Sequence, residues 1–309
     1  MGQVSIGVTD VPVTEAVDVC LHISGVTMHH ADGDLIEIPY LASAYDDATN
    51  CLNNVPAADP GSENNAIALS ELQGGLSVLI IDSQDVKAGR YNWIRLDIDE
   101  ALSYVSDSGG LQELSCPSCE ADQSGLKLNR GIVVPAGGAV DFMVDVDLAK
   151  SLNKRPSGDY NMRPTLRLVN LAETGDISGA VSESLIPSLI SETDTGCKVY
   201  VYEGHDVEPD DYHDLDNVLT SAKVLYDAGS MSYGYTAAYL PTDSTVDSTP
   251  YSVALTCDAD DMEIDQNNDP AAPTDTDVIF SDGESEQMSQ NVDVVTGETA
   301  IVPFPPASP

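Results

Sequence analysis

The stretch LKLNRGIVVPAGGAVDFMVDVDLAKSLNKRPSGDYNMRPTLRLV, residues 126–169, decides the fold. In its middle, side chains alternate between two faces: Val140, Phe142, Val144, Val146 and Leu148 on one, and Asp141, Met143, Asp145 and Asp147 on the other. A period of two with one apolar face predicts a half-buried β-strand. Residues 135–138 (PAGG) predict a tight turn, so residues 132–134 and the strand after the turn are expected to pair as a hairpin.

This stretch resembles the core of a family of bacterial surface lipoproteins, domain of unknown function 4382. The family is recognised by the segments LKL, RG, VPAGG, DF, DL and KSL, ending in PTLRLV, and each of them stands in residues 126–169. The resemblance extends back through VSIGVTDVP (residues 4–12) and AGRYNWIRL (residues 88–96) and spans about residues 3–169. It implies a fold and a place at the cell envelope, but no activity.

The sequence predicts two domains, both all-β and with little helix. The first, residues 1–170, is expected to be a β-sandwich with strands at 17–23, 35–38, 91–98, 132–148 and 165–169. The apolar run at 76–81 follows two glycines and is expected to form a short helix over a sheet edge. Polar and turn-forming residues at 170–176 (NLAETGD) interrupt the strand pattern, as expected of an exposed linker.

The second domain, residues 176–309, has short strand patterns separated by turn signals about every ten residues, which is typical of a β-sandwich. The expected strands are 177–181, 197–202, 218–224, 231–239, 251–257, 278–280, 292–295 and 300–304. Residues 239–241, 250–257 and 295–302 are similar to transthyretin-like and carbohydrate-binding-like modules. Two tandem sandwiches of the immunoglobulin or transthyretin type are therefore expected, ending in a loose, proline-rich tail.

The charge is strongly negative and unevenly spread. Residues 1–170 hold ten basic and 24 acidic side chains, a net charge of −14, and residues 171–309 hold two basic and 28 acidic ones, a net charge of −26. Such a surface repels nucleic acid and anionic membranes, so neither is expected as a partner. Adaptation to a saline habitat and local ion binding explain this acidity equally well at this point.

Six cysteines without metal-finger spacing favour an oxidising compartment outside the cytosol. The domain split leaves Cys197 and Cys257 as partners in the second domain, and Cys116–Cys119 and Cys20–Cys51 complete the expected set. Cys116 and Cys119 have the spacing of a redox motif, but no basic residue stands near them to lower a thiol pKa. A disulfide that closes a loop is the favoured interpretation.

Two acidic loops of the second domain are candidate calcium sites, because Ca²⁺ takes six to eight oxygen ligands. A merely solvated acidic rim is the competing interpretation. The segment 265–276 does not form an EF-hand, since Pro270 stands where that loop needs glycine. The candidate ligands are Asp206, Glu208, Asp210, Asp211, Asp258, Asp260, Asp261, Asp265, Asn267 and Asp269.

Histidines and charged residues of the first domain have structural interpretations. His29 and His30 with Asp32 and Asp34 could bind Zn²⁺ or Cu²⁺, but adjacent strand residues point to opposite faces, which favours ordinary turn residues. His22 is expected to face outward. A ladder of cross-strand ion pairs on an outer face is expected among Arg95, Asp97, Asp99, Asp141, Asp145, Asp147, Arg163 and Arg167.

Catalytic motifs are missing from the sequence. It contains no Gly-x-Ser-x-Gly, no His-Glu-x-x-His and no phosphate-binding glycine loop, and the segment 106–110 (SDSGG) lacks the histidine motif of trypsin-like proteases. The sequence therefore predicts a non-enzymatic binding, adhesion or extracellular structural module. A carbohydrate-binding module is one alternative, in which Tyr200, Tyr202, Tyr233, Tyr235 and Tyr239 would provide the stacking platform. A secreted hydrolase that uses carboxylates is the other.

Location follows from the family resemblance. Members carry an N-terminal signal that ends in a lipid-modified cysteine, so Met1 is expected to be an artificial start on a mature chain. No run of eighteen apolar residues occurs, so membrane attachment is expected only through a lipid absent from this chain. The expected place is the outer membrane, the cell surface or the extracellular space, with a glycan or a matrix or surface protein as partner.

Overall fold

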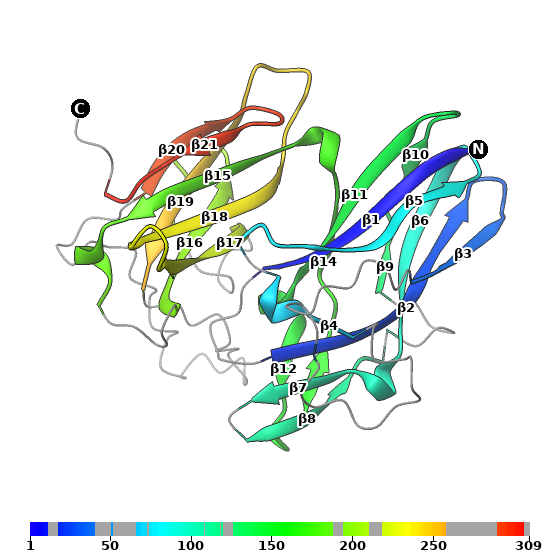
Figure 1. The fold of residues 1–309 in the computed structure, drawn as a ribbon, viewed down its shortest axis with the longest axis horizontal. Helices are drawn as coiled ribbons and strands as arrows, with labels where there is room; N and C mark the ends of the chain where they lie inside the picture. Colours follow the sequence, from blue (N-terminus) through cyan, green and yellow to red (C-terminus); the bar gives the residue numbers. More distant parts are fainter. Residues whose placement is uncertain are drawn as a thin grey trace. The chain divides into compact units, whose positions relative to one another are not determined.

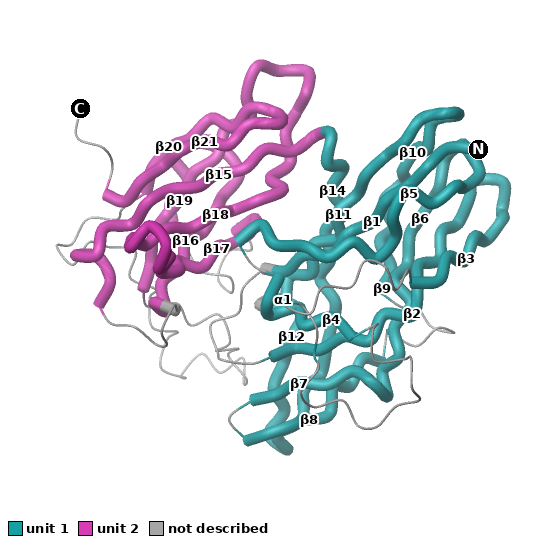
Figure 2. The backbone as a smooth tube through the Cα atoms, viewed as in Figure 1, with its two compact units in different colours: residues 1–10, 16–172 teal, residues 11–15, 173–309 magenta. Residues whose placement is uncertain are grey.

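The structure is a computed structural model that describes residues 1–11, 18–40, 51, 66–72, 74–107, 109–117, 119, 126–187, 194–209, 218–257 and 289–305. These residues form β-strands almost throughout (Figure 1), which confirms the all-β prediction. The chain divides into two compact units (Figure 2): unit 1 holds residues 1–10 and 16–172, and unit 2 holds residues 11–15 and 173–309. None of the described helices is long and apolar enough to cross a membrane.

Unit 1 contains a four-stranded sheet in the order β14-β11-β1-β5 and a ten-stranded sheet built on the path β10-β6-β2-β7-β8-β13-β12. On the larger sheet, β3 and β4 also pair with β2, and β9 pairs with β6. The strands are β1 (Gly2–Val11), β2 (Asp18–His30), β3 (Leu35–Pro39), β4 (Ala66–Ala68), β5 (Val78–Val86), β6 (Gly89–Ile98), β7 (Tyr104–Asp107), β8 (Gly110–Ser115), β9 (Leu126–Leu128), β10 (Ile132–Val134), β11 (Ala139–Asp147), β12 (Leu152–Lys154), β13 (Tyr160–Met162) and β14 (Leu166–Asn170).

Helical structure in the described residues is limited to single turns. They are the α-helix α1 (Leu148–Ser151) and the 3-10 turns η4 (Leu69–Glu71), η5 (Glu100–Leu102), η6 (Leu171–Glu173) and η7 (Glu183–Leu185). The helix predicted at 76–81 is wrong, because Val78–Val86 is an edge strand paired antiparallel with β1. Val78, Ile80 and Ile81 are buried on that strand, so a strand removes these apolar side chains from water as a helix would.

The hairpin predicted around residues 135–138 is also wrong. The turn exists, with Gly138 N donating to Pro135 O and Gly137 at a φ of +71°. However, it leads from β10, which pairs with β6, to β11, which pairs with β14 in the other sheet. The turn therefore carries the chain from one sheet of unit 1 to the other.

Strand β11 is buried on both faces along most of its length. Val144 and Val146 are fully buried, as the alternation predicts, but Met143 and Asp145 on the opposite face are only 3% and 5% exposed. Met143 packs where Gly7 of β1 leaves room, since a Cβ at Gly7 would come within 2.8 Å of the Met143 methyl. The strand is thus a central one, and the half-buried interpretation holds only for its first residues.

Unit 2 is one seven-stranded sheet in the order β20-β19-β16-β17-β18-β15-β21. Its end strands, β20 and β21, are joined by a short turn, so the sheet bends back on itself around one core, as a β-sandwich does. The strands are β15 (Thr174–Val181), β16 (Asp194–Glu203), β17 (Val218–Asp227), β18 (Ser232–Pro241), β19 (Thr249–Thr256), β20 (Ser289–Val294) and β21 (Thr299–Ile301). The expected strand at 278–280 lies outside the described residues.

The core of unit 2 consists of alternate side chains of these strands. Val199 and Val201 of β16 face Val253 and Leu255 of β19, and all four are at most 3% exposed. Gly179 allows β15 to approach the segment after β21, because a Cβ there would overlap the carbonyl oxygen of Val302. Burial of apolar strand faces contributes about 25 cal/mol per Å² and stabilises this unit.

Candidate ligand-binding site

The outward face of the larger sheet of unit 1 carries the single tryptophan of the chain. Strand β6 alternates there: Ile94 and Leu96 are fully buried, whereas Trp93 and Arg95 are partly exposed on the other face. The antiparallel register places His29 of β2 opposite Trp93. On the other side of β6, Lys127 of β9 stands opposite Arg95. We call His29, Trp93, Arg95 and Lys127 the Trp93 row.

The Trp93 ring contacts two neighbouring side chains. The imidazole of His29 stacks on it, with ring centroids 5.2 Å apart and planes inclined by 8°. The ammonium of Lys127 lies 4.3 Å from the ring centroid, within the range of a cation–π interaction. Asn92 contacts His29 Nδ1 over 3.3 Å. The row therefore positions the ammonium group of Lys127 on the sheet surface.

Arg95 lies over the tryptophan, with Cζ 6.0 Å from the ring centroid, and is also held by hydrogen bonds. Its Nε donates to Asp97 Oδ1 over 2.6 Å, and its Nη2 donates to Thr27 Oγ1 over 3.2 Å. Thr27 in turn donates to Asp97 Oδ2 over 2.6 Å. These hydrogen bonds hold the Arg95 guanidinium against the sheet face. Lys127 is the residue of the row that lines the neighbouring pocket.

A pocket of about 360 Å³ lies beside the row, between the β9–β10 segment and β14. It is lined by Lys127, Leu128, Asn129, Arg130, Pro164, Leu166, Arg167 and Leu168. One wall consists of residues 127–130 and the other of residues 164–168, which lie near the two ends of the stretch 126–169. The volume falls within the size range of small-molecule sites, about 300–1,000 Å³.

Three cations and no carboxylate line this pocket. Arg167 is paired with Asp145 across β11 and β14, at 2.6 Å from Nη2 to Oδ2. Arg130 donates from Nη1 to Leu168 O over 3.0 Å, which fixes its guanidinium at the pocket wall. Among the described residues, no carboxylate lies within 4 Å of the Lys127 or Arg130 nitrogens. In a chain with 52 acidic and 12 basic side chains, two cations on one pocket that pair with no described carboxylate form a local positive site.

The expected ion-pair ladder is wrong as a single feature, because its members lie on different sheets. Arg95 and Asp97 pair within β6, and Asp145 pairs with Arg167 in the four-stranded sheet. Asp147 instead caps α1 by accepting a hydrogen bond from Lys150 N over 3.0 Å. Burial raises the pKa of its carboxyl to about 6, although the hydrogen bond from Lys150 N works in the opposite direction.

The candidate calcium ligands are mostly outside the description. Asp210, Asp211, Asp258, Asp260, Asp261, Asp265, Asn267 and Asp269 lie outside the described residues. Asp206 accepts a hydrogen bond from Asn291 Nδ2 over 2.8 Å, and its own backbone N–H donates to Asn291 Oδ1. Glu208 is described on the same segment. In the described part of the chain, no group of three His, Cys, Asp or Glu side chains is arranged to hold a metal.

The histidines near the first hairpin are separated, as strand geometry requires. His29 belongs to the Trp93 row, whereas His30 Nδ1 contacts Asp32 Oδ1 at 2.6 Å. Lys87 forms ion pairs with both Asp32 and Asp34. The hydrogen bond from Lys87 is the main reason that the pKa of Asp32 is lowered. The two carboxylates that were considered as Zn²⁺ or Cu²⁺ ligands, Asp32 and Asp34, are therefore paired with the Lys87 ammonium.

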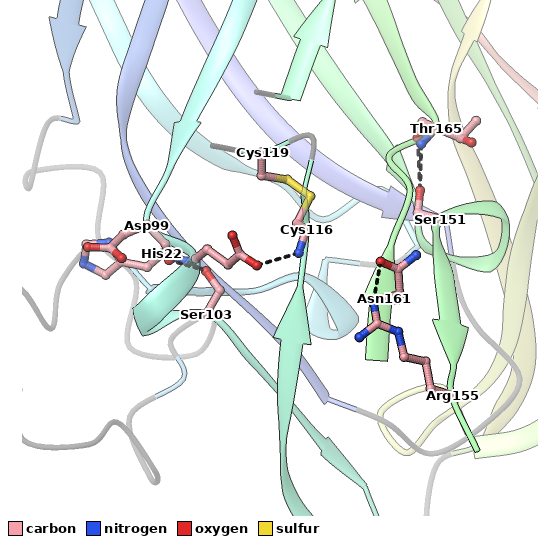
Figure 3. Close-up of a disulfide and its surroundings, with 10 residues drawn as sticks. His22, Asp99, Ser103, Cys116, Cys119, Ser151, Arg155, Asn161 and Thr165 are labelled. Carbon is pink, nitrogen blue, oxygen red and sulfur yellow. Dashed lines mark hydrogen bonds between the residues drawn. A yellow bond between two sulfur atoms is a disulfide. The ribbon is translucent and has the colours of Figure 1, made fainter. Parts of the chain in front are cut away.

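The six cysteines form three disulfides: Cys20–Cys51, Cys116–Cys119 and Cys197–Cys257. Cys197–Cys257 links β16 to the end of β19 within unit 2. Figure 3 shows Cys116–Cys119 beside the η5 turn, where Cys116 N donates to Glu100 Oε1 over 2.8 Å. Both of these cysteines are at most 3% exposed, which keeps exogenous thiols from the sulfur atoms.

A serine, a histidine and an aspartate meet next to this disulfide (Figure 3). Ser103 Oγ donates to the backbone oxygen of Asp99 over 2.8 Å and accepts the backbone N–H of His22 over 3.0 Å. His22 is 7% exposed, so its expected outward position is wrong. The serine hydroxyl is engaged by backbone groups, which gives it a role in joining β2 to η5.

The tyrosines do not form the stacking platform of the carbohydrate-binding interpretation. Tyr200, Tyr202 and Tyr235 are at most 4% exposed and belong to the interior of unit 2, whereas Tyr233 and Tyr239 are partly exposed. Sequence reasoning missed the Trp93 row and the pocket. The alternation around Ile94 and Leu96 places Trp93 outward, but the pairing of β9 with β6 has no local signal.

Solved structures resemble the chain only distantly. The Bacillus anthracis TIE protein matches with 7% identity over 99% of this chain, at a TM-score of 0.20, and this chain spans 34% of that protein's length. A minor pilin of Streptococcus agalactiae matches with 9% identity over 99% of this chain and 98% of its own, at a TM-score of 0.21. The Actinomyces fimbrial adhesin FimA matches with 9% identity over 96% and 89%, at a TM-score of 0.20.

Similarity at this level transfers neither function nor partner to this chain. No curated protein matches it. The family model, in contrast, matches residues 1–164, which include the whole Trp93 row and one wall of the pocket. This confirms the resemblance carried by residues 126–169: the chain belongs to the family described as domain of unknown function DUF4382.

Proposed function

We propose that this protein is a non-enzymatic binding module of the exported bacterial surface, and that it binds its ligand through the Trp93 row and the adjoining pocket of unit 1. The observation that carries the proposal is that two cations, Lys127 and Arg130, line one pocket of a strongly acidic chain and pair with no carboxylate among the described residues. Holding like charges together without a counterion is unfavourable, and a bound ligand would relieve that cost.

The proposed location outside the cytosol has independent support. Three disulfides in one chain are typical of oxidising compartments. Anchoring at the outer membrane through an N-terminal lipid remains part of the proposal, on the basis of the family resemblance. The net charge of −40 makes nucleic acid and anionic membranes poor partners, so the proposed partner is a surface glycan or a matrix or surface protein.

Stacking of a sugar ring on a bare aromatic face does not suit this site. His29 covers one side of Trp93 and Lys127 lies over the ring as well. A carbohydrate ligand would instead be recognised through its charges and hydroxyl groups. This favours a polar pocket over the flat aromatic platform that the tyrosines were expected to form.

A hydrolase finds less support than binding. Ser103 is engaged by the backbone of Asp99 and His22, and the Asp147 carboxylate caps α1. The Ser103 hydroxyl is thus engaged by backbone groups, whereas nucleophilic catalysis requires a hydroxyl activated by a general base that a third group orients. Carboxylate-only chemistry needs a pair of acids flanking a substrate, and the pocket lining contains none.

The test is retention of the intact protein on immobilised polysaccharides, matrix proteins and whole bacterial cells. The proposal predicts saturable retention on at least one of these materials, and weaker retention of the double variant Lys127→Met/Arg130→Gln. Substrate panels for esterase, protease and glycosidase activity should show no turnover. Absence of retention on every material would reject the binding proposal, and turnover abolished by one Ser, Asp or Glu substitution would establish the hydrolase.

A further inference from the structure

We infer that the pocket beside the Trp93 row binds an acidic sugar unit of an anionic polysaccharide, with the sugar's anionic substituent held between Lys127 and Arg130. This rests on the proposed binding function and names its ligand class. The geometry that points to it is the combination of two fixed cations with a lining that is otherwise partly apolar.

The two cations are held in place before any ligand arrives. The stack of His29 on Trp93 orients the ring, and the ring in turn holds Lys127 Nζ at 4.3 Å. Arg130 is fixed by its hydrogen bond to Leu168 O, and its other guanidinium N–H groups are left for a ligand. Preorganised donors of this kind bind an anion at a lower entropic cost than mobile surface lysines.

Arg167 adds a second reason for an anionic ligand. Its Nε and Nη2 both donate to Asp145 Oδ2, at 3.1 and 2.6 Å. Its Nη1, however, is buried with no hydrogen-bond partner among the described residues. A buried donor without an acceptor is destabilising, and since Arg167 lines the pocket, a ligand oxygen that reached Nη1 would relieve this.

The rest of the lining suits a sugar ring better than a bare inorganic anion. Leu128, Pro164 and Leu166 contribute apolar surface, and Asn129 contributes an amide group that can both donate and accept. The C–H groups of a pyranose can pack against the apolar surface, and its hydroxyl groups can form hydrogen bonds with the Asn129 amide. The volume of about 360 Å³ accommodates one such unit, so the polymer would continue outside the pocket.

The net charge of the whole protein affects how an anionic ligand can bind. At −40, the long-range field repels polyanions, so attraction must come from short contacts inside the pocket. Added salt screens the repulsion, because the Debye length falls to about 8 Å at about 0.15 M. Binding should therefore persist or strengthen between low and moderate salt, unlike binding to a broad basic patch.

The single tryptophan makes the test direct. Trp93 supplies all indole fluorescence of the chain, and Lys127 lies against its ring. We would titrate the intact protein with trigalacturonate, with a sulfated dextran oligomer and with neutral dextran oligomer, and follow Trp93 emission and the heat of binding. A saturable change is expected with at least one of the two acidic glycans and none with the neutral one.

Matched variants separate the pocket from general charge effects. Lys127→Met and Arg130→Gln should each raise the Kd for the acidic glycan about tenfold. Arg155→Gln removes the same charge from an exposed residue of unit 1 that is paired with Asp159, and it should leave the Kd unchanged. Because these variants change surface-accessible cations, their far-ultraviolet circular dichroism should match that of the wild type.

The outcomes distinguish this inference from the proposed function. Equal binding of acidic and neutral glycans, or an unchanged Kd in both pocket variants, would overturn the inference while the binding function stands. Binding of polyglutamate as tightly as of the acidic glycans would also overturn it, since it would show recognition of carboxylates without the sugar. Retention on no material at all would reject the proposed function itself.

Discussion

Asp145 and Arg167 stand opposite each other on β11 and β14, and their side chains meet at 2.6 Å. The side chain of Asp145 is 7% exposed and that of Arg167 is 19% exposed, so the pair is largely withdrawn from water. The Arg167 side chain also lines the candidate pocket. One cross-strand ion pair thus connects the core of the smaller sheet to the proposed ligand site.

Removing one partner of this pair should be more damaging than removing both. Asp145→Ala leaves a largely buried guanidinium without its acceptor and is expected to lower the free energy of unfolding by about 3 kcal/mol. The double variant Asp145→Ala/Arg167→Met leaves no unpaired charge and should lose less. Urea denaturation of the wild type and the variants measures both effects. An equal loss in the single and double variants would contradict this account.

Local patterns in the sequence were sufficient to predict most of unit 2. Turn residues separate apolar alternation there, and seven of the eight expected segments coincide with β15 to β21 or the residues just after it. In unit 1 the expected segments coincide with β2, β3, β6, β10, β11 and β14, but β5 was expected to be a helix and the short strands β4, β7, β8, β9, β12 and β13 were missed. The turn at 135–138 has the residues of a hairpin, but nothing local distinguishes a turn within one sheet from one that passes between two sheets.

The candidate site needed the tertiary structure for a related reason. Lys127 and Arg130 lie some forty residues before Arg167, and only the pairing of β9 with β6 and the packing of β14 bring them to one pocket. The distribution of charge along the sequence instead favoured a calcium site in the acidic segments of the second domain. In a chain dominated by carboxylates, the few unpaired cations carry more information, but a sequence does not show which cations are paired.

The disulfide of unit 2 should contribute much more stability than the short one in unit 1. Cys197 and Cys257 are 60 residues apart, and loop entropy predicts a loss of about 4 kcal/mol when both are replaced by alanine. Cys116 and Cys119 are three residues apart, so the corresponding double variant serves as the control, with a loss of about 1–2 kcal/mol. Thermal and urea denaturation measure the losses, and non-reducing peptide mapping checks the pairing. Equal losses would argue against the loop-entropy explanation.

Each unit is expected to fold without the other. The core cluster of unit 2 runs from Ile177 to Phe304, so a fragment of residues 173–309 contains all of it. A fragment of residues 1–172 contains both sheets of unit 1. Both fragments should give cooperative unfolding transitions by circular dichroism and dispersed amide signals by NMR. If neither does, the two units form a single cooperative domain.

Calcium is proposed to bind the acidic loops of residues 206–217 and 258–269, and unit 2 is where its effect should appear. The 28 acidic side chains of residues 171–309 against two basic ones create repulsion that any salt relieves. A real site should raise the melting temperature of unit 2 with micromolar to millimolar Ca²⁺ beyond the rise in Na⁺ at equal ionic strength. The variant Asp265→Asn/Asp269→Asn should remove this excess, and identical shifts with both ions would leave only a solvated rim.

Asp147 should make the stability of unit 1 fall as pH rises through the weakly acidic range. Burial raises the pKa of its carboxyl from 3.8 to about 6, so the folded chain binds a proton that the unfolded chain has already released between these values. Stability therefore decreases from about pH 4 to about pH 6 and levels off above that, by a total on the order of 2–3 kcal/mol. Carboxylates with a lowered pKa, such as Asp107, act oppositely and only at lower pH.

The variant Asp147→Asn isolates this contribution. Asparagine also caps helices, so the hydrogen bond from Lys150 N to the side-chain oxygen can be retained while the titrating proton is removed. The difference in unfolding free energy between this variant and the wild type should grow in favour of the variant from pH 4 to pH 7. Asp147→Ala, which also loses the cap, should show the same pH trend, offset by about 1 kcal/mol toward lower stability. A difference that does not change with pH would show that the Asp147 carboxyl titrates normally in the folded protein.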